Sequence, residues 1–435
     1  MERESSTQQS RQWFKLDNAG KIFPGQNTAR WSNVFRASVY LKEDIDREVL
    51  EKAIELTLPR FPCFDVRIRR GIFWYYFERQ AGVLPPIMDD VNNPCHRVSF
   101  KENNRFLFRV YVYGARLSVE FFHALSDAYG ASVFLCTLTA VYLNLKGAGI
   151  PPGEMVLDIN GEVQAGELED AFVRYANSKA KIKRSSDYVY HAKGTRLPAH
   201  HINVTTGYID CEAYHNKARE LGVTITELSA AILMDIHYRK QLREERKQRK
   251  VSVQVPVNLR RHFPSSTLRN FSLCYNIKLD PAKGDYSFEE ILKQTALFLR
   301  YINNPKELNA MMTKNMALER NTVMRLMPLF IKRAGIYTAA AISAEKTISA
   351  MFSNMGIIKL PEQMQPYIDR FMLMAGPGKL NGARIAAVTY GNTMAMSFAD
   401  IYEEHDIERE FFTRLVKMGV HVKIESNRGA DAPDK

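Results

Sequence analysis

The chain has 435 residues, of which 46% are hydrophobic and 25% are charged, and its formal net charge at pH 7 is +12. This composition is typical of a globular protein with a sizeable core, and it excludes a disordered chain, a collagen-like repeat and a coiled coil. The positive excess favours anionic partners: nucleic acid, acidic lipid or a phosphate-bearing small molecule.

The first 145 residues carry the pattern of a sheet covered by helices. Residues 32–41 alternate between apolar and polar side chains, as in a strand with one buried face. Pro59 ends the helix that follows this strand. Further strands are predicted over 64–70, 72–78, 105–113 and 116–123, and an amphipathic helix over 134–145.

A polar, basic stretch at 178–200 separates this half from a second one with a similar pattern. Thr224 and Glu227 have the spacing of a capping box, which predicts the start of a long helix. Gly391 and Asn392 are typical of a two-residue hairpin turn. The predicted strands of the second half are 203–210, 251–259, 271–279, 347–356, 367–376, 383–391, 393–399 and 420–426.

The pattern divides the chain into two lobes of the α/β class, each an α+β two-layer sandwich. The predicted segments are an N-terminal lobe (1–185), a linker (186–202), a C-terminal lobe (203–427) and a disordered tail (428–435). Two such lobes are expected to face each other across a cleft.

The five cysteines are odd in number and form no CxxC pair, which argues against a disulfide framework and a zinc ribbon. The N-terminus has no apolar signal segment, so we expect a cytoplasmic location. The longest weakly polar stretch, 326–351, is interrupted by charged residues, so no membrane span is expected. Its Pro328 and Gly335 instead favour a packed helix pair with a bend, buried or lining the cleft.

Several other kinds of site are not expected. The basic run at 239–250 is interrupted by Glu244 and Glu245 and is interpreted as a solvated helix end, not a nucleic-acid site. His200 and His201 lack the cysteine or carboxylate spacing of a metal site. Walker, Rossmann and GxSxG patterns are absent from the sequence.

The residues best suited to catalysis lie in the segment 121–127. A predicted strand ends at His123, and Asp127 follows where a helix is expected to begin. Histidine titrates near neutrality, so it can take a proton from a nucleophile and return it to a leaving group. A carboxylate at this spacing can fix the turn by pairing with an arginine or with the backbone. The alternative interpretation is a core histidine at a strand end, because His-x-x-x-Asp alone is a weak pattern.

The segment FFHALSDAYGASVFLCTL resembles the active-site segment of the chloramphenicol-acetyltransferase-like superfamily. That superfamily includes nonribosomal-peptide condensation domains, plant BAHD acyltransferases, polyketide-associated acyltransferases, wax-ester synthases and bacterial alcohol acetyltransferases. The segments KLDNAGKIFP, VPVNLRRHFPSSTLRNFS and SNMG resemble the alcohol-acetyltransferase-like branch. The resemblance spans about residues 12 to 427.

The resemblance implies two chloramphenicol-acetyltransferase-like lobes facing across a central tunnel, and an acyltransferase. An acyl group, expected to be acetyl, would pass directly from a coenzyme A thioester to an alcohol or amine, without a covalent enzyme intermediate. His123 matches the general base, and Asp127 a structural aspartate whose candidate partner is Arg260. Asn354 is the candidate for polarising the thioester oxygen. Acyl-CoA would be a co-substrate, with no permanently bound cofactor and no metal.

The sequence departs from the family pattern in three ways. Phe122 stands where many members have a first histidine, Ala128 stands where a glycine often follows the aspartate, and a DFGWG segment is missing. The last difference argues against a plant-type or assembly-line enzyme. Two alternatives stay open: a donor carried by an acyl carrier protein, and a non-catalytic binding module of the same fold.

Overall fold

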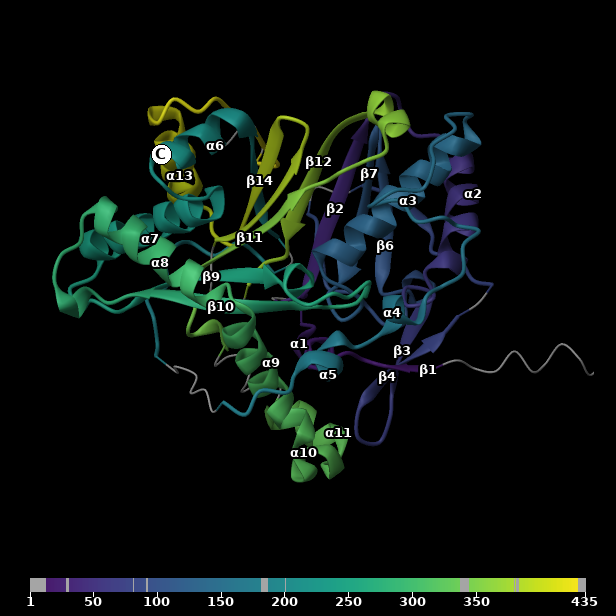
Figure 1. The fold of residues 1–435 in the computed structure, drawn as a ribbon, viewed down its shortest axis with the longest axis horizontal. Helices are drawn as coiled ribbons and strands as arrows, with labels where there is room; N and C mark the ends of the chain where they lie inside the picture. The colour runs from purple at the N-terminus through teal and green to yellow at the C-terminus, as the bar shows by residue number, and fades with distance from the viewer. Residues whose placement is uncertain are drawn as a thin grey trace, which may run out of the picture.

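The computed structural model describes residues 13–28, 31–80, 82–90, 93–180, 187–199, 201–336, 344–378, 380 and 383–428. Within these residues the strands form three sheets, of five, seven and three strands (Figure 1). The predicted disordered tail lies outside the described residues, except for Arg428.

The five-stranded sheet carries the strand that ends at the candidate catalytic histidine. Its order is β12 (Ile368–Ala375), β2 (Val34–Leu41), β7 (Arg116–Phe122), β6 (Phe108–Tyr113) and β5 (Ile87–Asp89). Its strands are antiparallel except β5 and β6, which run parallel. Helix α3 (Ala128–Leu145) packs against β2 and against α2 (Arg47–Thr57).

The seven-stranded sheet belongs to the second half of the chain. Its order is β10 (Ser272–Leu279), β9 (Val251–Asn258), β11 (Ala350–Ile357), β13 (Arg384–Tyr390), β14 (Thr393–Asp400), β8 (Asn203–Asp210) and β15 (Val422–Ser426). Helix α7 (Ile225–Glu244), which begins at the predicted capping box, packs on this sheet. Its helical neighbours are α6 (Cys211–Glu220), α8 (Phe288–Ile302) and α13 (Asp406–Lys417).

The three-stranded sheet and the short helices lie around these two layers. The small sheet has the order β1 (Trp13–Lys15), β4 (Tyr75–Arg79) and β3 (Val66–Arg70). The remaining α-helices are α1 (Phe23–Gln26), α4 (Ala165–Leu168), α5 (Ala171–Tyr175), α9 (Pro305–Arg320), α10 (Thr322–Leu326) and α11 (Leu329–Ile331). The 3-10 turns include Leu58–Arg60, Asn103–Arg105, Leu259–Arg261, Pro281–Lys283 and Glu362–Tyr367, and Lys332–Ile336 forms a π turn.

Strand β12 joins the two halves of the chain. The sequence places it in the C-terminal lobe, but it pairs antiparallel with β2 in the five-stranded sheet, where Phe371 lies opposite Val39. The strands on either side of it in sequence, β11 and β13, pair with each other in the seven-stranded sheet. The chain therefore crosses from one sheet to the other and back. The boundaries assigned to the lobes and the linker stay a prediction.

Helix α3 starts earlier than its apolar stripe predicts. Asp127 caps the helix by accepting the backbone N–H of Gly130, so the helix begins at Ala128. It is long and apolar enough to cross a membrane by length and composition alone, but 78% of its residues are buried inside the protein. A helix that is apolar all round is also what the core of a large globular protein requires, and α3 fills that position.

The expectation for the stretch 326–351 is confirmed only in part, since Leu329 and residues 347–350 are buried. Pro328 does introduce a bend, since it separates α10 from α11. However, Leu326, Phe330 and Ile331 are exposed and do not pack in a buried helix pair. Residues 337–343 lie outside the described part of the chain.

Candidate active site

His123 follows the last residue of β7, the central strand of the five-stranded sheet. Its backbone N–H donates to the carbonyl of Asn33, 2.8 Å away, and continues the pairing between β7 and β2. The imidazole stacks on Phe23 with ring centroids 4.8 Å apart, and the edge of Phe35 lies at 5.1 Å. The ring is half-buried, so it is held in one orientation without being sealed from a ligand.

Phe121 lies on β7, two residues before His123, and its ring belongs to an aromatic cluster. Its ring lies 5.6 Å from Phe35 and from Phe64, 5.9 Å from Phe134 and 6.0 Å from Phe108. All five rings are buried. Aromatic pairs at these distances stabilise beyond their burial alone, so the strand that delivers His123 has a fixed position.

Asn270 determines which nitrogen of His123 is available as a base. Its Oδ1 lies 3.0 Å from His123 Nδ1, while its Nδ2 donates to the His123 carbonyl at 2.9 Å and to the Asp17 carboxylate at 3.2 Å. Because both of these partners are acceptors, the amide orientation follows from the network. Oδ1 therefore accepts a hydrogen bond from Nδ1–H, and in the neutral imidazole Nε2 carries the lone pair.

Asp17 belongs to the N-terminal segment and holds Asn270 in this orientation. It is fully buried, and it also accepts the backbone N–H of Gly20 at 2.6 Å. Its Oδ2 lies 3.6 Å from Arg269 Nε. A buried carboxylate needs such partners. The same segment places Phe23 on the imidazole, so one stretch of chain supplies both the stacking ring and the anchor.

Asp127 and Arg260 are brought together by the structure. Arg260 Nη1 lies 2.8 Å from Asp127 Oδ2, and both side chains are buried. The same carboxylate oxygen accepts the backbone N–H of Phe271 at 2.8 Å. Asp127 thus joins the turn that carries His123 to the loop that carries Asn270.

The guanidinium of Arg260 also organises the loop itself. Its Nε and Nη2 donate to the carbonyl of Thr267, and Nη2 donates to that of Arg269 at 2.6 Å. The ring of Tyr129 lies 4.6 Å below it. With its planar fork of donors saturated, Arg260 fixes the path of residues 267–269 directly before Asn270.

Gly130 permits the close approach of this loop to helix α3. A Cβ at this position would lie 2.0 Å from the carbonyl oxygen of Leu268, a backbone atom that cannot move aside alone. We expect Gly130→Ala to destabilise the fold by about 1–3 kcal/mol or more and to lower activity by displacing Asn270. Thermal unfolding of the variant checks this, with Gly335→Ala as the control, because a Cβ there meets open space. Equal melting temperatures for the two variants would contradict the expectation.

Asn354 lies on β11, at the irregularity before Ile357. Its amide Nδ2 donates to Thr226 Oγ1 at 3.2 Å, and its Oδ1 accepts the backbone N–H of Gly356 at 3.0 Å. None of its described hydrogen bonds goes to His123 or Asp127. The next residue, Met355, accepts a hydrogen bond from Ser132 in the first turns of α3, so this part of β11 lies beside the start of that helix.

Asn33 is a candidate that sequence reasoning missed. It has a φ of 49°, in the left-handed region that asparagine tolerates, and its carbonyl holds the backbone of His123. Its amide Nδ2 is buried and has no hydrogen-bond partner in the part of the chain that the structure describes. A buried, unpaired donor is unfavourable in the absence of a ligand, and this one belongs to the residue that contacts the candidate base.

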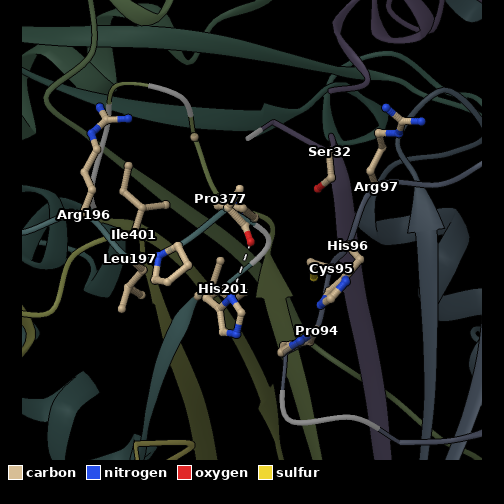
Figure 2. Close-up of a pocket in the computed structure, with 14 residues that line it drawn as sticks. Ser32, Pro94, Cys95, His96, Arg97, Arg196, Leu197, His201, Pro377 and Ile401 are labelled. Carbon is tan, nitrogen blue, oxygen red and sulfur yellow. Dashed lines mark hydrogen bonds between the residues drawn. The ribbon is translucent and has the colours of Figure 1, made fainter. Parts of the chain in front are cut away.

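A cavity of about 580 Å³, including the part open to solvent, lies at the seam between the two halves (Figure 2). Among the described residues, its lining includes two arginines and two histidines and no acidic residue: His96, Arg97, Arg196 and His201. Figure 2 shows Arg196 and Arg97 on opposite sides of it. Ser32, next to Asn33, belongs to the lining. Since the start of β2 pairs with the end of β7, the cavity and His123 lie at the same end of these two strands.

The wall of this cavity is fastened to strand β7. The buried Glu120 accepts the backbone N–H of Cys95 at 2.6 Å and pairs with Arg36 and Arg109, each at an N–O distance of 2.7–2.8 Å. Arg109 also donates to the carbonyl of His96. The loop that forms the basic wall of the cavity is therefore held by β7, the strand that ends directly before the candidate base.

The buried cysteines are not suited to act as nucleophiles. Burial raises the pKa of the Cys63 thiol to about 12, and it also raises the pKa values of Cys95 and Cys136. The thiolate is the reactive form, so these three thiols stay protonated at neutral pH.

Asn270 and Asp17 are the other functional residues that sequence reasoning missed. Both lie inside segments that carry the family resemblance, yet no spacing pattern connects them because 253 positions separate them. Only the fold brings the two side chains to His123.

No family model matches the chain, and a search of curated proteins finds no match. Solved structures do match. Polyketide synthase associated protein 5 from Mycobacterium tuberculosis has a TM-score of 0.59 and 15% identity, covering 92% of this chain and 96% of that one. F. graminearum TRI101, solved with coenzyme A and T-2 mycotoxin, has a TM-score of 0.61 and 12% identity, covering 93% and 97%.

The first condensation domain of the calcium-dependent antibiotic synthetase, solved with a substrate analogue, has a TM-score of 0.60 and 12% identity, covering 94% of this chain and 95% of that one. One of these neighbours was thus solved with coenzyme A bound, and another is a condensation domain. The predicted fold is therefore confirmed, and at these identities the likeness concerns the fold alone.

Proposed function

We propose that the protein is an acyltransferase that moves an acyl group from a coenzyme A thioester to an alcohol or amine, with His123 as the general base. The observation that carries this proposal is the hydrogen bond from His123 Nδ1 to Asn270 on a half-buried ring, which in the neutral imidazole places the lone pair on Nε2. A general base must present this lone pair to the acceptor's proton. The fold, shared with CoA-dependent acetyltransferases, supports the same conclusion.

In this mechanism His123 carries out both proton transfers. Nε2 takes the proton of the acceptor hydroxyl or amine as the acceptor atom attacks the thioester carbonyl carbon. The tetrahedral intermediate then breaks its C–S bond, and the imidazolium returns the proton to the leaving sulfur. The Nδ1–Asn270 hydrogen bond persists throughout and holds the ring in place while its charge changes.

The negative charge on the thioester oxygen needs a hydrogen-bond donor. Asn33 has a buried amide N–H without a described partner, on the residue that holds the His123 backbone. Asn354, the sequence-based candidate, already donates to Thr226. Since a donor without a competing partner needs no reorganisation, Asn33 is the stronger candidate for this role, and Asn354 stays an alternative.

The basic cavity suits the phosphates of the donor. Arginine forks match phosphate geometry, and the described lining of the cavity holds Arg97 and Arg196 with two histidines and no carboxylate. The loop with His96 and Arg97 is tied to Glu120 on the strand that ends before His123. A phosphate group bound here would therefore have a fixed position relative to the base.

Charge reversal in this cavity is expected to weaken binding of the donor and to leave binding of the acceptor unchanged. Arg97→Glu and Arg196→Glu should each raise KM for acetyl-CoA by about tenfold or more, with little change in KM for the acceptor. With acetyl-pantetheine as the donor, which lacks the nucleotide phosphates, the same substitutions should raise KM far less. Arg246→Glu, an exposed arginine elsewhere, is the matched control. Equal losses with both donors would contradict this placement.

A comparison of donors tests the proposal against its alternatives. Free acyl-CoA and the same acyl group on a carrier-protein pantetheine are supplied at equal concentration, with thiol release and acylated acceptor both measured. Faster transfer from acyl-CoA supports the proposal. A strict requirement for the carrier protein would replace it by the carrier-dependent function. Binding of neither donor would favour a non-catalytic module.

A further inference from the structure

Two segments far apart in the sequence form an apolar projection at one end of the molecule. The loop between β3 and β4 and the helices α10 and α11 extend together from the body (Figure 1). The backbone N–H of Leu329 donates to the carbonyl of Ile72 at 2.8 Å and joins the two segments. We name this projection the apolar tip, and it consists of Ile72, Phe73, Val323, Leu326, Phe330 and Ile331.

The side chains of the apolar tip are unusually exposed for their type. Ile72 and Phe330 are 76% and 72% exposed, more than any other large hydrophobic side chain in the described residues. Val323 and Leu326 are 69% and 64% exposed. Single exposed apolar residues are ordinary on protein surfaces, but a contiguous group marks an interaction site.

The tip is a built feature, held together from inside by Lys332. This lysine is fully buried, its Nζ donates to the carbonyl of Phe73 at 2.9 Å, and the ammonium lies 3.5 Å from the centre of the Trp74 ring. Burial lowers the pKa of Lys332. One side chain thus fastens the π turn that follows α11 to the hairpin, while the apolar side chains around it face solvent.

The charge around the tip selects the kind of partner. Residues 69–73 and 321–333 contain no acidic residue, and Arg70, Arg325 and Arg333 are exposed there. Arg69 is also exposed but pairs with Glu78, and Lys332 is buried. Two copies joined tip to tip would bring like charges together, which disfavours a second copy of this chain as the partner. Apolar side chains surrounded by arginines are the composition of segments that enter the interface of an anionic bilayer. The net charge of +12 adds long-range attraction.

The tip is connected to the candidate active site through the N-terminal segment. The Trp74 ring also lies 5.7 Å from Lys21 Nζ, and Lys21 pairs with Glu319 at the end of α9. Phe23, two residues further, stacks on the imidazole of His123. A surface bound at the tip would therefore lie close to the N-terminal segment that contacts His123.

We propose that the apolar tip docks the protein on an anionic lipid surface, with its apolar side chains in the interface and its arginines at the headgroups. A second step, which rests on the proposed function, is that the substrate class includes an apolar acceptor or acyl donor that reaches His123 from that surface. The docking itself requires no catalytic activity, so the two steps can be tested apart.

The test uses the full chain and vesicles of two compositions. Phosphatidylcholine vesicles and vesicles of phosphatidylcholine with phosphatidylglycerol are sedimented with the protein. We expect binding to the anionic vesicles, weakened by salt. Phe330→Glu should weaken it by about tenfold or more, whereas Leu297→Glu, at an exposed leucine on α8, should not. Arg325→Glu should also weaken it, in contrast to Arg219→Glu on α6.

Three outcomes would overturn the docking proposal. One is that the wild-type protein does not bind anionic vesicles, and another is that Phe330→Glu and Leu297→Glu bind them equally. A dimer in solution that Phe330→Glu converts to a monomer would show that a second copy covers the tip. His123→Ala should bind vesicles as the wild type does. Vesicle binding without any transferase activity would refute the proposed function and leave docking intact.

Discussion

Replacing His123 with alanine is expected to lower kcat for acyl transfer by about 10²- to 10⁴-fold, the usual contribution of a general base. The imidazole Nε2 is the group proposed to take the acceptor's proton, and the variant has no other base in its place. The measurement is the rate of thiol release from acyl-CoA with a saturating acceptor, compared between variant and wild type.

The variant should have a lower rate of acyl transfer but should still fold and still bind the donor. His123 contributes stacking against Phe23 and Phe35 and one hydrogen bond to Asn270, whereas the anchoring pair of Asp127 and Arg260 does not involve its ring. Circular dichroism and the dissociation constant for CoA should therefore stay near the wild-type values. Full transferase activity in a folded His123→Ala protein would eliminate the proposed role.

Replacing Asn270 with alanine is expected to lower kcat by about 10²-fold or more, although Asn270 touches no substrate in the proposed mechanism. Its Oδ1 holds Nδ1 of His123, and its loss frees the ring to rotate and to place the proton on the other nitrogen. The fall should appear in kcat, with KM for the donor nearly unchanged, because the basic cavity does not include Asn270.

Two further variants separate positioning from general destabilisation. Asn276→Ala on β10 removes hydrogen bonds to Gln254 and Thr347 at a distance from the imidazole, and it should leave kcat near the wild-type value. Asp17→Asn keeps the side-chain volume but removes the charge that orients the Asn270 amide, and it should cause an intermediate loss. Equal kcat in Asn270→Ala and Asn276→Ala would show that Asn270 has no positioning role.

Much of the fold was predictable because local patterns determine it. The alternation in residues 32–41 predicts β2, and the capping box at Thr224 predicts the start of α7. The pairing of β12 with β2 was not predictable, since an alternating strand does not state which neighbour it takes. The exposure of Phe330 was likewise hidden, because an apolar run has the same pattern in a core and at a docking surface.

The site was predictable only as far as its motif extends. His123 and Asp127 lie in one short segment, and the resemblance pointed to Arg260, which the structure places on Asp127. The residues that orient the imidazole, Asn270 and Asp17, come from segments that meet only in the folded chain. Hydrogen bonds of this kind leave no periodicity in a sequence.

The central claim is direct acyl transfer at His123, and the measurement that tests it most directly is acceptor-dependent thiol release. Acetyl-CoA and a longer acyl-CoA are supplied with a panel of alcohols and amines, while acylated acceptor and the intact mass of the protein are followed in the same reactions. The account predicts thiol release that rises with one class of acceptor, equals the acylated acceptor formed, and leaves the protein unmodified. Stoichiometric acylation of the protein, or thiol release at the same rate without acceptor, would contradict it.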